Sequence, residues 1–336
     1  MKKNMLVLCD LEVEYVSQLN NYMSTKKNVP FEVHAFTDVD MCADFVKGHK
    51  ADVLMVSEEA KYELSKKTED IKAGSVFILS DETAPYNESG EKCVYKYQNT
   101  ENILKEVMHT YSESSVPVAG MYQVGDGISF IGVYSPVKRS LKTLFALTLG
   151  QILSLEKRVL YINMEEYSGF NSIMKTAYMT DLSDIMYYIS RGKPNFIWKM
   201  ASITQSIGGL DYIPPALSPL DIKSVDKDMW FAFFEELKKC DYETVILDMG
   251  EGVDGLYEIL RYCDRIYTPV KDDGMSYAKM EQYEALLKIM EYDDILEKTR
   301  KLSFSTFTDI NNGPERLIYS QLGNYIREMM REGSGI

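Results

Sequence analysis

Short apolar runs alternate with amphipathic segments along the first third of the chain. Five of these runs have the length of buried strands, and the segments between several of them have helical spacing. The predicted strands are Met5–Cys9, Phe31–Phe36, Ala51–Ser57, Ser75–Leu79 and Cys93–Tyr97, and the predicted helices span 12–23, 41–48 and 102–111. Because strands that alternate with helices form parallel sheets, residues 1–112 are expected to fold as a doubly wound α/β domain of the flavodoxin or receiver type.

The same alternation restarts after residues 113–127, a stretch with Ser, Pro and Gly that we interpret as a linker. The later predicted strands are Ile128–Tyr134, Arg158–Asn163, Leu210–Pro214, Tyr242–Asp248, Arg265–Val270 and Lys301–Phe307. Helical spacing recurs at 143–155, 181–190, 227–239, 255–263, 277–292 and 315–331, and Asp181 is a predicted N-cap. Residues 128–336 therefore predict a second doubly wound domain with a parallel sheet.

The loop after the first strand of the second domain has the residues of a phosphate-binding loop. Residues 135–143 read SPVKRSLKT, and the Lys-Thr pair opens the predicted helix. In a P-loop the lysine binds the β- and γ-phosphates, the hydroxyl binds Mg²⁺, and the helix N-terminus adds free amides. An ordinary strand–turn–helix that begins with Lys-Thr accounts equally well for this segment alone. The candidate nucleotide-binding residues are Ser135, Lys138, Arg139, Ser140, Lys142 and Thr143.

The ends of two later strands extend this pattern. One strand ends with Asn163 and is followed by Glu165, and another ends with Asp248. With these features residues 128–336 resemble the MinD/ParA superfamily of deviant Walker A ATPases, whose pattern is S-P-x-x-G-x-G-K-[ST], then a strand ending D-x-D, then a strand ending in Asp. The resemblance implies ATP on the loop, Mg²⁺ held by Thr143 and Asp248, and Glu165 and Asp248 as the catalytic acids.

Several positions depart from the family pattern. Arg139 and Leu141 replace the two loop glycines, Val137 stands where the family has a second lysine, and Asn163 takes the first D-x-D position. A non-glycine residue held in a left-handed conformation costs about 1–2 kcal/mol, and asparagine cannot act as a base. We expect a degenerate site with weak or lost hydrolysis. An active ATP-hydrolysing regulator is the alternative.

The first domain has a receiver topology without the group that receivers phosphorylate. A phosphorylatable receiver needs acids after strand one, an Asp at the end of strand three, a hydroxyl after strand four and a Lys after strand five. The corresponding residues are Asp10, Ser57, Ser80 and Lys96. Serine lacks the carboxylate that forms an acyl phosphate, so we predict a pseudo-receiver used for docking or dimerisation. A generic small α/β domain, or a signalling output protein controlled by phosphotransfer, are the alternatives.

Composition narrows the classes of function. The 336 residues carry a net charge of −14, which disfavours nucleic acid as a partner. Five scattered cysteines and three histidines do not predict a zinc site or a disulfide framework. No run reaches the ~18 apolar residues of a bilayer span, so we expect a cytoplasmic protein. The amphipathic last helix is expected to pack on the sheet, with membrane contact only indirect or weak.

A receiver-like domain followed by a MinD/ParA-like domain resembles the TadZ/CpaE proteins, which localise and assemble type IV pilus secretion machinery. The resemblance implies an assembly or polar-localisation factor for a Tad-like pilus or secretion system. Such a protein forms a homodimer, docks on secretion and pilus assembly proteins, and is recruited to a membrane-bound assembly at the cell pole.

Overall fold

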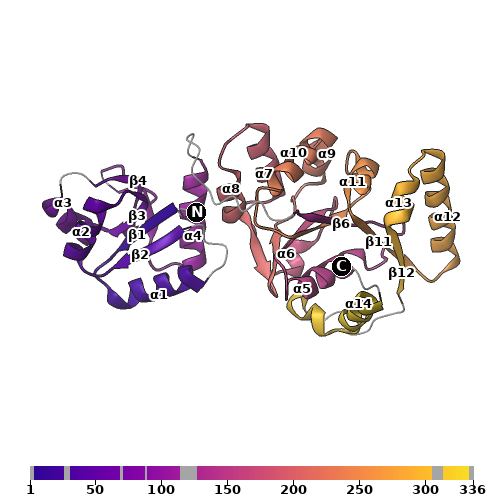
Figure 1. The fold of residues 1–336 in the computed structure, drawn as a ribbon, viewed down its shortest axis with the longest axis horizontal. Helices are drawn as coiled ribbons and strands as arrows, with labels where there is room; N and C mark the ends of the chain where they lie inside the picture. Colours follow the sequence, from indigo (N-terminus) through magenta and orange to yellow (C-terminus); the bar gives the residue numbers. More distant parts are fainter. Residues whose placement is uncertain are drawn as a thin grey trace. The chain divides into compact units, whose positions relative to one another are not determined.

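The computed structural model describes residues 4–25, 31–68, 71–87, 89–113, 127–304 and 313–332. Contacts within the chain group it into two compact units (Figure 1). Unit 1 comprises residues 1–122 together with 193–202, and unit 2 comprises 123–192 and 203–336. Each unit is built on a parallel or mostly parallel sheet, so the α/β class predicted from the sequence is confirmed.

Unit 1 is a five-stranded parallel sheet in the order β2-β1-β3-β4-β5, which is the flavodoxin-like order. Its elements are β1 (Asn4–Cys9), α1 (Val13–Thr25), β2 (Phe31–Phe36), α2 (Val39–Gly48), β3 (Ala51–Ser57), α3 (Glu58–Lys67), β4 (Ala73–Ser80), β5 (Cys93–Tyr95), α4 (Thr100–Ser112) and α8 (Phe196–Ile203). The parallel order brings the carboxyl ends of β1, β3, β4 and β5 to one edge. The sequence pattern predicted this edge as the receiver site.

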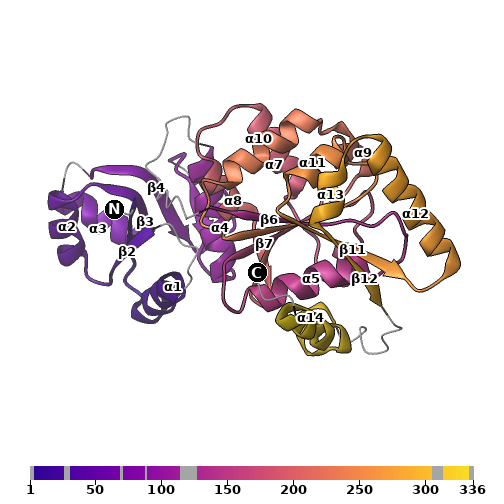
Figure 2. The same ribbon diagram turned by 45° about the vertical axis from the view of Figure 1, so that its right-hand side comes forward.

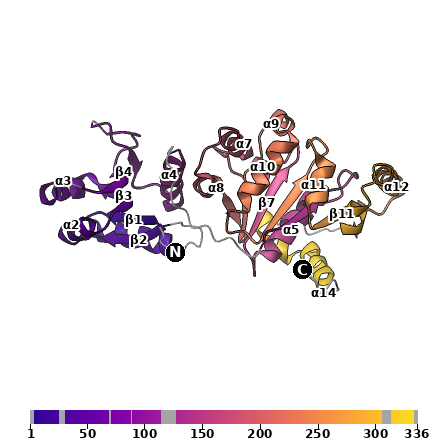
Figure 3. The same ribbon diagram turned by 45° about the horizontal axis from the view of Figure 1, so that its top comes forward.

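Alternate residues of each buried strand point to opposite faces of the sheet. In β1, Leu6 and Leu8 pack with α1 and α4, whereas Val7 and Cys9 pack with α2 and α3. Figures 1 and 3 show α2 and α3 on one side of the strands and α4 on the other. Both faces are covered, which explains why the strands are continuous apolar runs.

Helix α8 completes the core of unit 1, although its sequence lies far from the rest of that unit. Trp198 is buried between Phe31 and Tyr111, with ring centroids 4.8 Å from each. Lys193 also forms an ion pair with Glu113. The sequence pattern assigned this segment to the second domain, 128–336, whereas the contacts within the chain assign residues 193–202 to unit 1.

Unit 2 has a seven-stranded sheet in the order β12-β11-β6-β10-β7-β9-β8, in which only the β8–β9 pair is antiparallel. Its strands are β6 (Ser129–Val133), β7 (Val159–Met164), β8 (Gln205–Ile207), β9 (Leu210–Ile213), β10 (Thr244–Met249), β11 (Arg265–Lys271) and β12 (Thr299–Phe304). Its helices are α5 (Lys142–Leu153), α6 (Phe170–Ile173), α7 (Leu182–Ser190), α9 (Pro219–Ser224), α10 (Lys227–Leu237), α11 (Leu256–Tyr262), α12 (Gly274–Ile289), α13 (Asp293–Lys298), η1 (Pro314–Tyr319) and α14 (Gln321–Glu332). The central strands β6, β7 and β10 end beside the N-terminus of α5.

The helices of unit 2 cover both faces of the sheet. Figures 1 and 2 show α5 and α14 on one side and α10 and α11 on the other. The predicted strand 301–307 extends past Phe304 into residues outside the described ones. No helix in the described part of the chain is long and apolar enough to cross a bilayer.

The predicted single helix 315–331 is wrong in one detail. A 3-10 turn, η1, is followed by α14, and Ser320 separates the two and caps α14 by accepting a hydrogen bond from the Gly323 amide at 3.1 Å. The apolar face of α14, with Leu322 and Ile326 fully buried, packs into the core. The helix therefore packs on the domain, as expected.

Candidate functional site

The loop between β6 and α5 keeps the backbone path of a glycine-containing loop without the glycines. Arg139 and Leu141, which occupy the two glycine positions of the family pattern, have φ of 57° and 62°. Each left-handed residue costs about 1–2 kcal/mol relative to glycine. The loop therefore carries backbone strain at these two residues.

Ser135 anchors the start of this loop. Its hydroxyl donates to the carbonyl oxygen of Pro269 at 2.6 Å and accepts from the amide of Val137 at 3.1 Å. The Val137 side chain, at the position of the second lysine in the family pattern, is buried and lines the cavity beside the loop. Lys138 is exposed and forms an ion pair with Glu251 at 3.5 Å.

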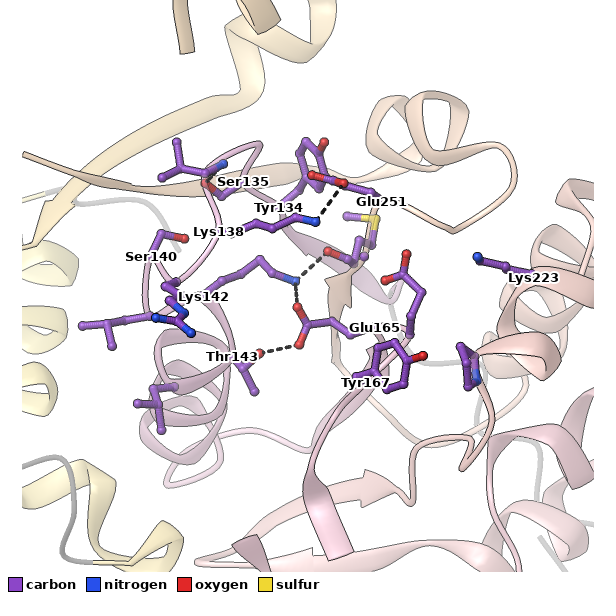
Figure 4. Close-up of a pocket in the computed structure, with 18 of the residues that line it drawn as sticks. Tyr134, Ser135, Lys138, Ser140, Lys142, Thr143, Glu165, Tyr167, Lys223 and Glu251 are labelled. Atoms are coloured by element: carbon purple, nitrogen blue, oxygen red, sulfur yellow. Dashed lines mark hydrogen bonds and ion pairs between the residues drawn. The ribbon is translucent and has the colours of Figure 1, made fainter. Parts of the chain in front are cut away.

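Lys142, the first residue of α5, lies among oxygen atoms of the strand ends (Figure 4). Its ammonium is 2.7 Å from Asp248 Oδ1, 2.9 Å from Glu165 Oε1 and 2.6 Å from the carbonyl oxygen of Met249. Burial alone lowers the pKa of Lys142, but the charges of Asp248 and Glu165 outweigh it and the net pKa is raised. The candidate phosphate-binding lysine is thus charged and already paired.

Asp248 is fully buried and its second oxygen is also occupied. Asp248 Oδ2 accepts from the Tyr161 hydroxyl at 2.8 Å and from Asn163 Nδ2 at 3.2 Å. Burial beside this carboxylate raises the pKa of Tyr161 well above its ordinary value, so the hydroxyl stays a donor. The register pairs Asp248 with Asn163 on the adjacent strand, which places the amide where the family has an acid.

Glu165 bridges the lysine and the threonine that open the helix. Its Oε2 accepts from Thr143 Oγ1 at 2.9 Å while its Oε1 pairs with Lys142. The backbone amide of Glu165 in turn donates to Asn163 Oδ1 at 3.0 Å, which fixes the chain where it leaves β7. The structure therefore brings the predicted residues Lys142, Thr143, Glu165 and Asp248 into one cluster.

The cluster borders a cavity of about 760 Å³, which is within the range of small-molecule sites. Ser140 lines this cavity, and its buried hydroxyl has no hydrogen-bond partner among the described residues. The loop path, the free hydroxyl and the Lys-Thr pair fit a triphosphate with Mg²⁺, because they supply amides, a cation and a metal-binding hydroxyl. In the described ranges no three acids, histidines or cysteines cluster as a metal site of their own.

Lys223 is a cavity residue that the sequence pattern did not indicate. It comes from α9, which begins at the N-cap Ser218, and Figure 4 shows its side chain reaching toward the cavity from the wall opposite Lys142. Tyr161 was missed as well, because a buried strand residue with a hydroxyl carries no motif. Alternation along β7 puts Tyr161 on the same face of the sheet as Asn163. Only the register of β7 with β10, which pairs Asn163 with Asp248, shows that this face is also the face of Asp248.

The predicted receiver residues of unit 1 also come together, around a second cavity of about 970 Å³. Lys96 is nearly buried, and its ammonium lies 3.0 Å from Asp10 Oδ2 and 2.9 Å from Glu12 Oε1. Burial lowers the pKa of Lys96, but its bonds to Glu12 and Asp10 raise it above the ordinary value overall. The lysine of this site is therefore held by two acids too.

The two serines of the receiver site act as local backbone caps. Ser57 Oγ accepts from the Ala60 amide at 3.3 Å and so caps α3, and Ser80 Oγ accepts from the Glu82 amide at 3.1 Å. Ser57 stands at the end of β3, where a phosphorylatable receiver has its aspartate. The arrangement holds a helix N-terminus and has no carboxylate at the acceptor position.

Comparisons with known proteins agree with this description. Residues 1–112 match the model of the TadZ-like receiver domain. No curated protein matches the chain.

Several solved structures resemble part of the chain. A putative plasmid partition protein from Borrelia burgdorferi bound to AMPPNP is 17% identical over 60% of this chain and 95% of its own, with a TM-score of 0.44. A McdA–ATP complex from Cyanothece is 13% identical over 54% and 71%, with a TM-score of 0.41. A cobyrinic acid a,c-diamide synthase from Mycobacterium smegmatis, with an ATP analogue and magnesium, is 12% identical over 57% and 81%, with a TM-score of 0.42. These likenesses are too distant to support a conclusion about this chain.

The family match covers the whole of the sheet β1–β5 and all four predicted receiver residues. Residues 1–112 are therefore similar to a TadZ-like receiver domain.

Proposed function

We propose that the protein is a cytoplasmic assembly or polar-localisation factor for a Tad-like type IV pilus or secretion system. It acts as a homodimer that docks on components of the machinery, and it binds ATP·Mg²⁺ with weak or no hydrolysis. The observation that carries the proposal is the TadZ-like receiver match together with Ser57 at the acceptor position. Because this receiver has no aspartate that could accept a phosphoryl group, its surface is proposed to serve for docking.

The geometry of unit 2 supports a nucleotide-binding role for the second half. The loop backbone is left-handed at Arg139 and Leu141, and a phosphate-binding loop needs this path to point its amides inward. Weak hydrolysis follows from the buried Val137 and from Asn163. The first removes the cation that stabilises charge on the transferring phosphoryl group, and the second removes a base.

The proposal is tested by locating the protein in its native host. A fluorescent fusion is expected to form foci at the pole, to lose them when the pilus machinery is deleted, and to keep them when Ser57 is replaced by Ala. The Ser57→Ala fusion is the matched control for a phosphotransfer requirement. Uniform fluorescence in the presence of the machinery would contradict the assembly role.

An active ATPase that regulates assembly is the second candidate, and Thr143 at the start of α5 together with Asp248 at the end of β10 favours it. Turnover of ATP·Mg²⁺ is measured for the wild type and for Lys142→Ala. We expect calorimetric binding that Lys142→Ala abolishes, with little turnover in either protein. Substantial turnover that disappears in the variant would favour the active ATPase.

Phosphotransfer to unit 1 is tested separately with acetyl phosphate. Stable labelling of residues 1–112 is not expected, because Ser57 cannot form an acyl phosphate. Stable labelling at that position would revive the signalling alternative.

A further inference from the structure

The Glu165 carboxylate contacts both residues that open α5, Lys142 and Thr143. Its two oxygens contact Lys142 Nζ at 2.9 Å and Thr143 Oγ1 at 2.9 Å. In a phosphate-binding loop these are the two groups that take a phosphate oxygen and the metal ion. One internal carboxylate therefore satisfies both groups when no ligand is bound.

From this contact we infer that Glu165 is an internal phosphate mimic that closes the site to every anion except a metal-bound polyphosphate. The inference rests on the proposed nucleotide site, and it adds that Glu165 determines which ligand can bind there. Glutamate has one methylene more than the aspartate of the family pattern, and this extra reach is used in the contacts with α5.

The charges around Lys142 explain the selection. Lys142 faces Asp248 and Glu165, so the group of three is net negative before any ligand arrives. A free polyphosphate that takes Lys142 leaves two carboxylates without their cation, and Asp248 is fully buried. An unpaired buried charge is strongly destabilising. The ligand must therefore bring a cation of its own, and Mg²⁺ bound to a polyphosphate supplies it.

The groups around the two carboxylates limit which cation of the protein itself could replace Lys142 beside them. Asp248 Oδ2 is held by the neutral donors Tyr161 and Asn163, which cannot replace a positive charge. Lys138 is engaged with Glu251 at the cavity rim. Lys223 reaches toward the cavity from the opposite wall and Arg139 also lines it, and both can attract an anion without contributing to the Lys142 cluster.

The decisive variant is Glu165→Gln, which keeps the shape of the side chain and removes its charge. Binding of inorganic tripolyphosphate is measured by calorimetry with Mg²⁺ and, separately, with EDTA. We expect Glu165→Gln to bind metal-free tripolyphosphate at least tenfold more tightly than the wild type. The ratio between the Mg²⁺ and EDTA affinities should fall by a similar factor.

Glu284→Gln is the matched control. Glu284 on α12 pairs with Lys301 at 2.6 Å away from the cavity, so the substitution removes the same charge and one lysine partner. It should leave both affinities within twofold of the wild type. An equal gain in Glu284→Gln would assign the effect to overall charge and overturn the inference.

A ligand-independent measurement covers the case in which no polyphosphate binds. Trinitrophenylation of Lys142, followed by mass spectrometry, reports how firmly its ammonium is held. Glu165→Gln should raise the rate of Lys142 modification several-fold and leave Lys301 unchanged, with folding checked by circular dichroism. An unchanged Lys142 rate overturns the inference.

The outcomes separate this inference from the proposed function. If Glu165→Gln behaves like the wild type while Lys142→Ala abolishes ATP·Mg²⁺ binding, the mimic is wrong and the nucleotide site stands. If Glu165→Gln gains tripolyphosphate binding but the fusion never locates to the machinery, the mimic stands and the assembly role is wrong.

Discussion

Each unit contains a lysine held by two acids at the carboxyl edge of its sheet, but the loops that carry these lysines differ in strain. Lys96 follows β5 and pairs with Asp10 and Glu12, whereas Lys142 opens α5 and pairs with Asp248 and Glu165. The non-glycine residues with left-handed φ in the described chain are all in unit 2, and two of them flank Ser140 in the phosphate loop.

The difference supports the proposal that the site of unit 2 binds a ligand. Strained backbone persists only where the surrounding structure imposes it, and such strain gathers at binding sites. Unit 1 has a relaxed receiver edge whose serines cap the backbone, which is the arrangement of a site used for structure. Both sites border a cavity, but only the loop of unit 2 holds non-glycine residues in the left-handed region, which supports the proposal that this site binds a ligand.

The largest expected effect comes from removing each lysine in turn. Lys96→Met leaves Asp10 buried without its cation, and Lys142→Met does the same to Asp248, so each should lower the free energy of unfolding of its own unit by about 3–5 kcal/mol. Only Lys142→Met should also abolish ATP·Mg²⁺ binding. Loss of nucleotide binding in Lys96→Met would break the comparison.

The chain offers a reporter for each unit, because its two tryptophans are divided between them. Trp198 is buried in unit 1 and Trp230 in unit 2. Urea unfolding followed by fluorescence in Trp230→Phe and Trp198→Phe backgrounds therefore measures the two units separately. Each background without a lysine substitution is its own control.

A smaller effect is expected at the receiver acceptor position. Ser57→Ala removes the cap of α3 and should lower the stability of unit 1 by about 1 kcal/mol. Ser57→Asp keeps a capping oxygen and should lie within about 0.5 kcal/mol of the wild type, since Asp and Ser are similar caps. Equal stability of Ser57→Ala and the wild type would show that the cap contributes nothing.

The strain in the phosphate loop is tested by Arg139→Gly. Relief of about 1–2 kcal/mol is partly offset by the greater freedom of glycine in the unfolded chain, about 0.5–1 kcal/mol. A net stabilisation of unit 2 by roughly 0.5–1 kcal/mol is expected from these two estimates, measured by urea unfolding. Arg139→Ala removes the same side chain but keeps the left-handed strain, and it should give no gain. A stabilisation of Arg139→Ala equal to that of Arg139→Gly would assign the effect to the lost charge.

The smallest effect is the pH dependence, which should be similar in the two units. The pKa values of Lys96 and Lys142 are raised in the folded protein, so their pairing contributes fully below the ordinary lysine pKa of 10.5 and is lost as the pH rises through the folded value. The stability difference between the wild type and each Lys→Met variant should therefore shrink above that pH.

Most of the fold was readable from the sequence because both sheets are buried on both faces. Buried parallel strands are continuous apolar runs, and Phe31–Phe36 and Ala51–Ser57 were predicted with the bounds that the structure has. Asp181 caps α7 as predicted, within a capping box with Asp184. Helix α3 was missed, because its lysine-rich and glutamate-rich segment has few apolar positions.

The sequence predicted which site residues lie at strand ends, but it did not predict which of them contact one another. The motif located Lys142, Thr143, Glu165 and Asp248, yet their mutual pairing depends on the register of β10 with β7 and on the length of the Glu165 side chain. The left-handed path through Arg139 and Leu141 was not readable either. Both side chains disfavour it locally, and the tertiary structure imposes it.

Helix α8 has a practical consequence for anyone who dissects the protein. The core of unit 1 includes Trp198, so a fragment that ends after residue 112 carries the family-matched sequence with Phe31 and Tyr111 uncovered. Cleavage of the chain within 114–126 is expected to give two fragments that stay associated, because residues 193–202 pack in unit 1. The receiver expressed alone is expected to aggregate, because the apolar side chains that α8 covers are exposed. A receiver fragment with α8 joined to it by a short flexible linker should remain folded and monomeric.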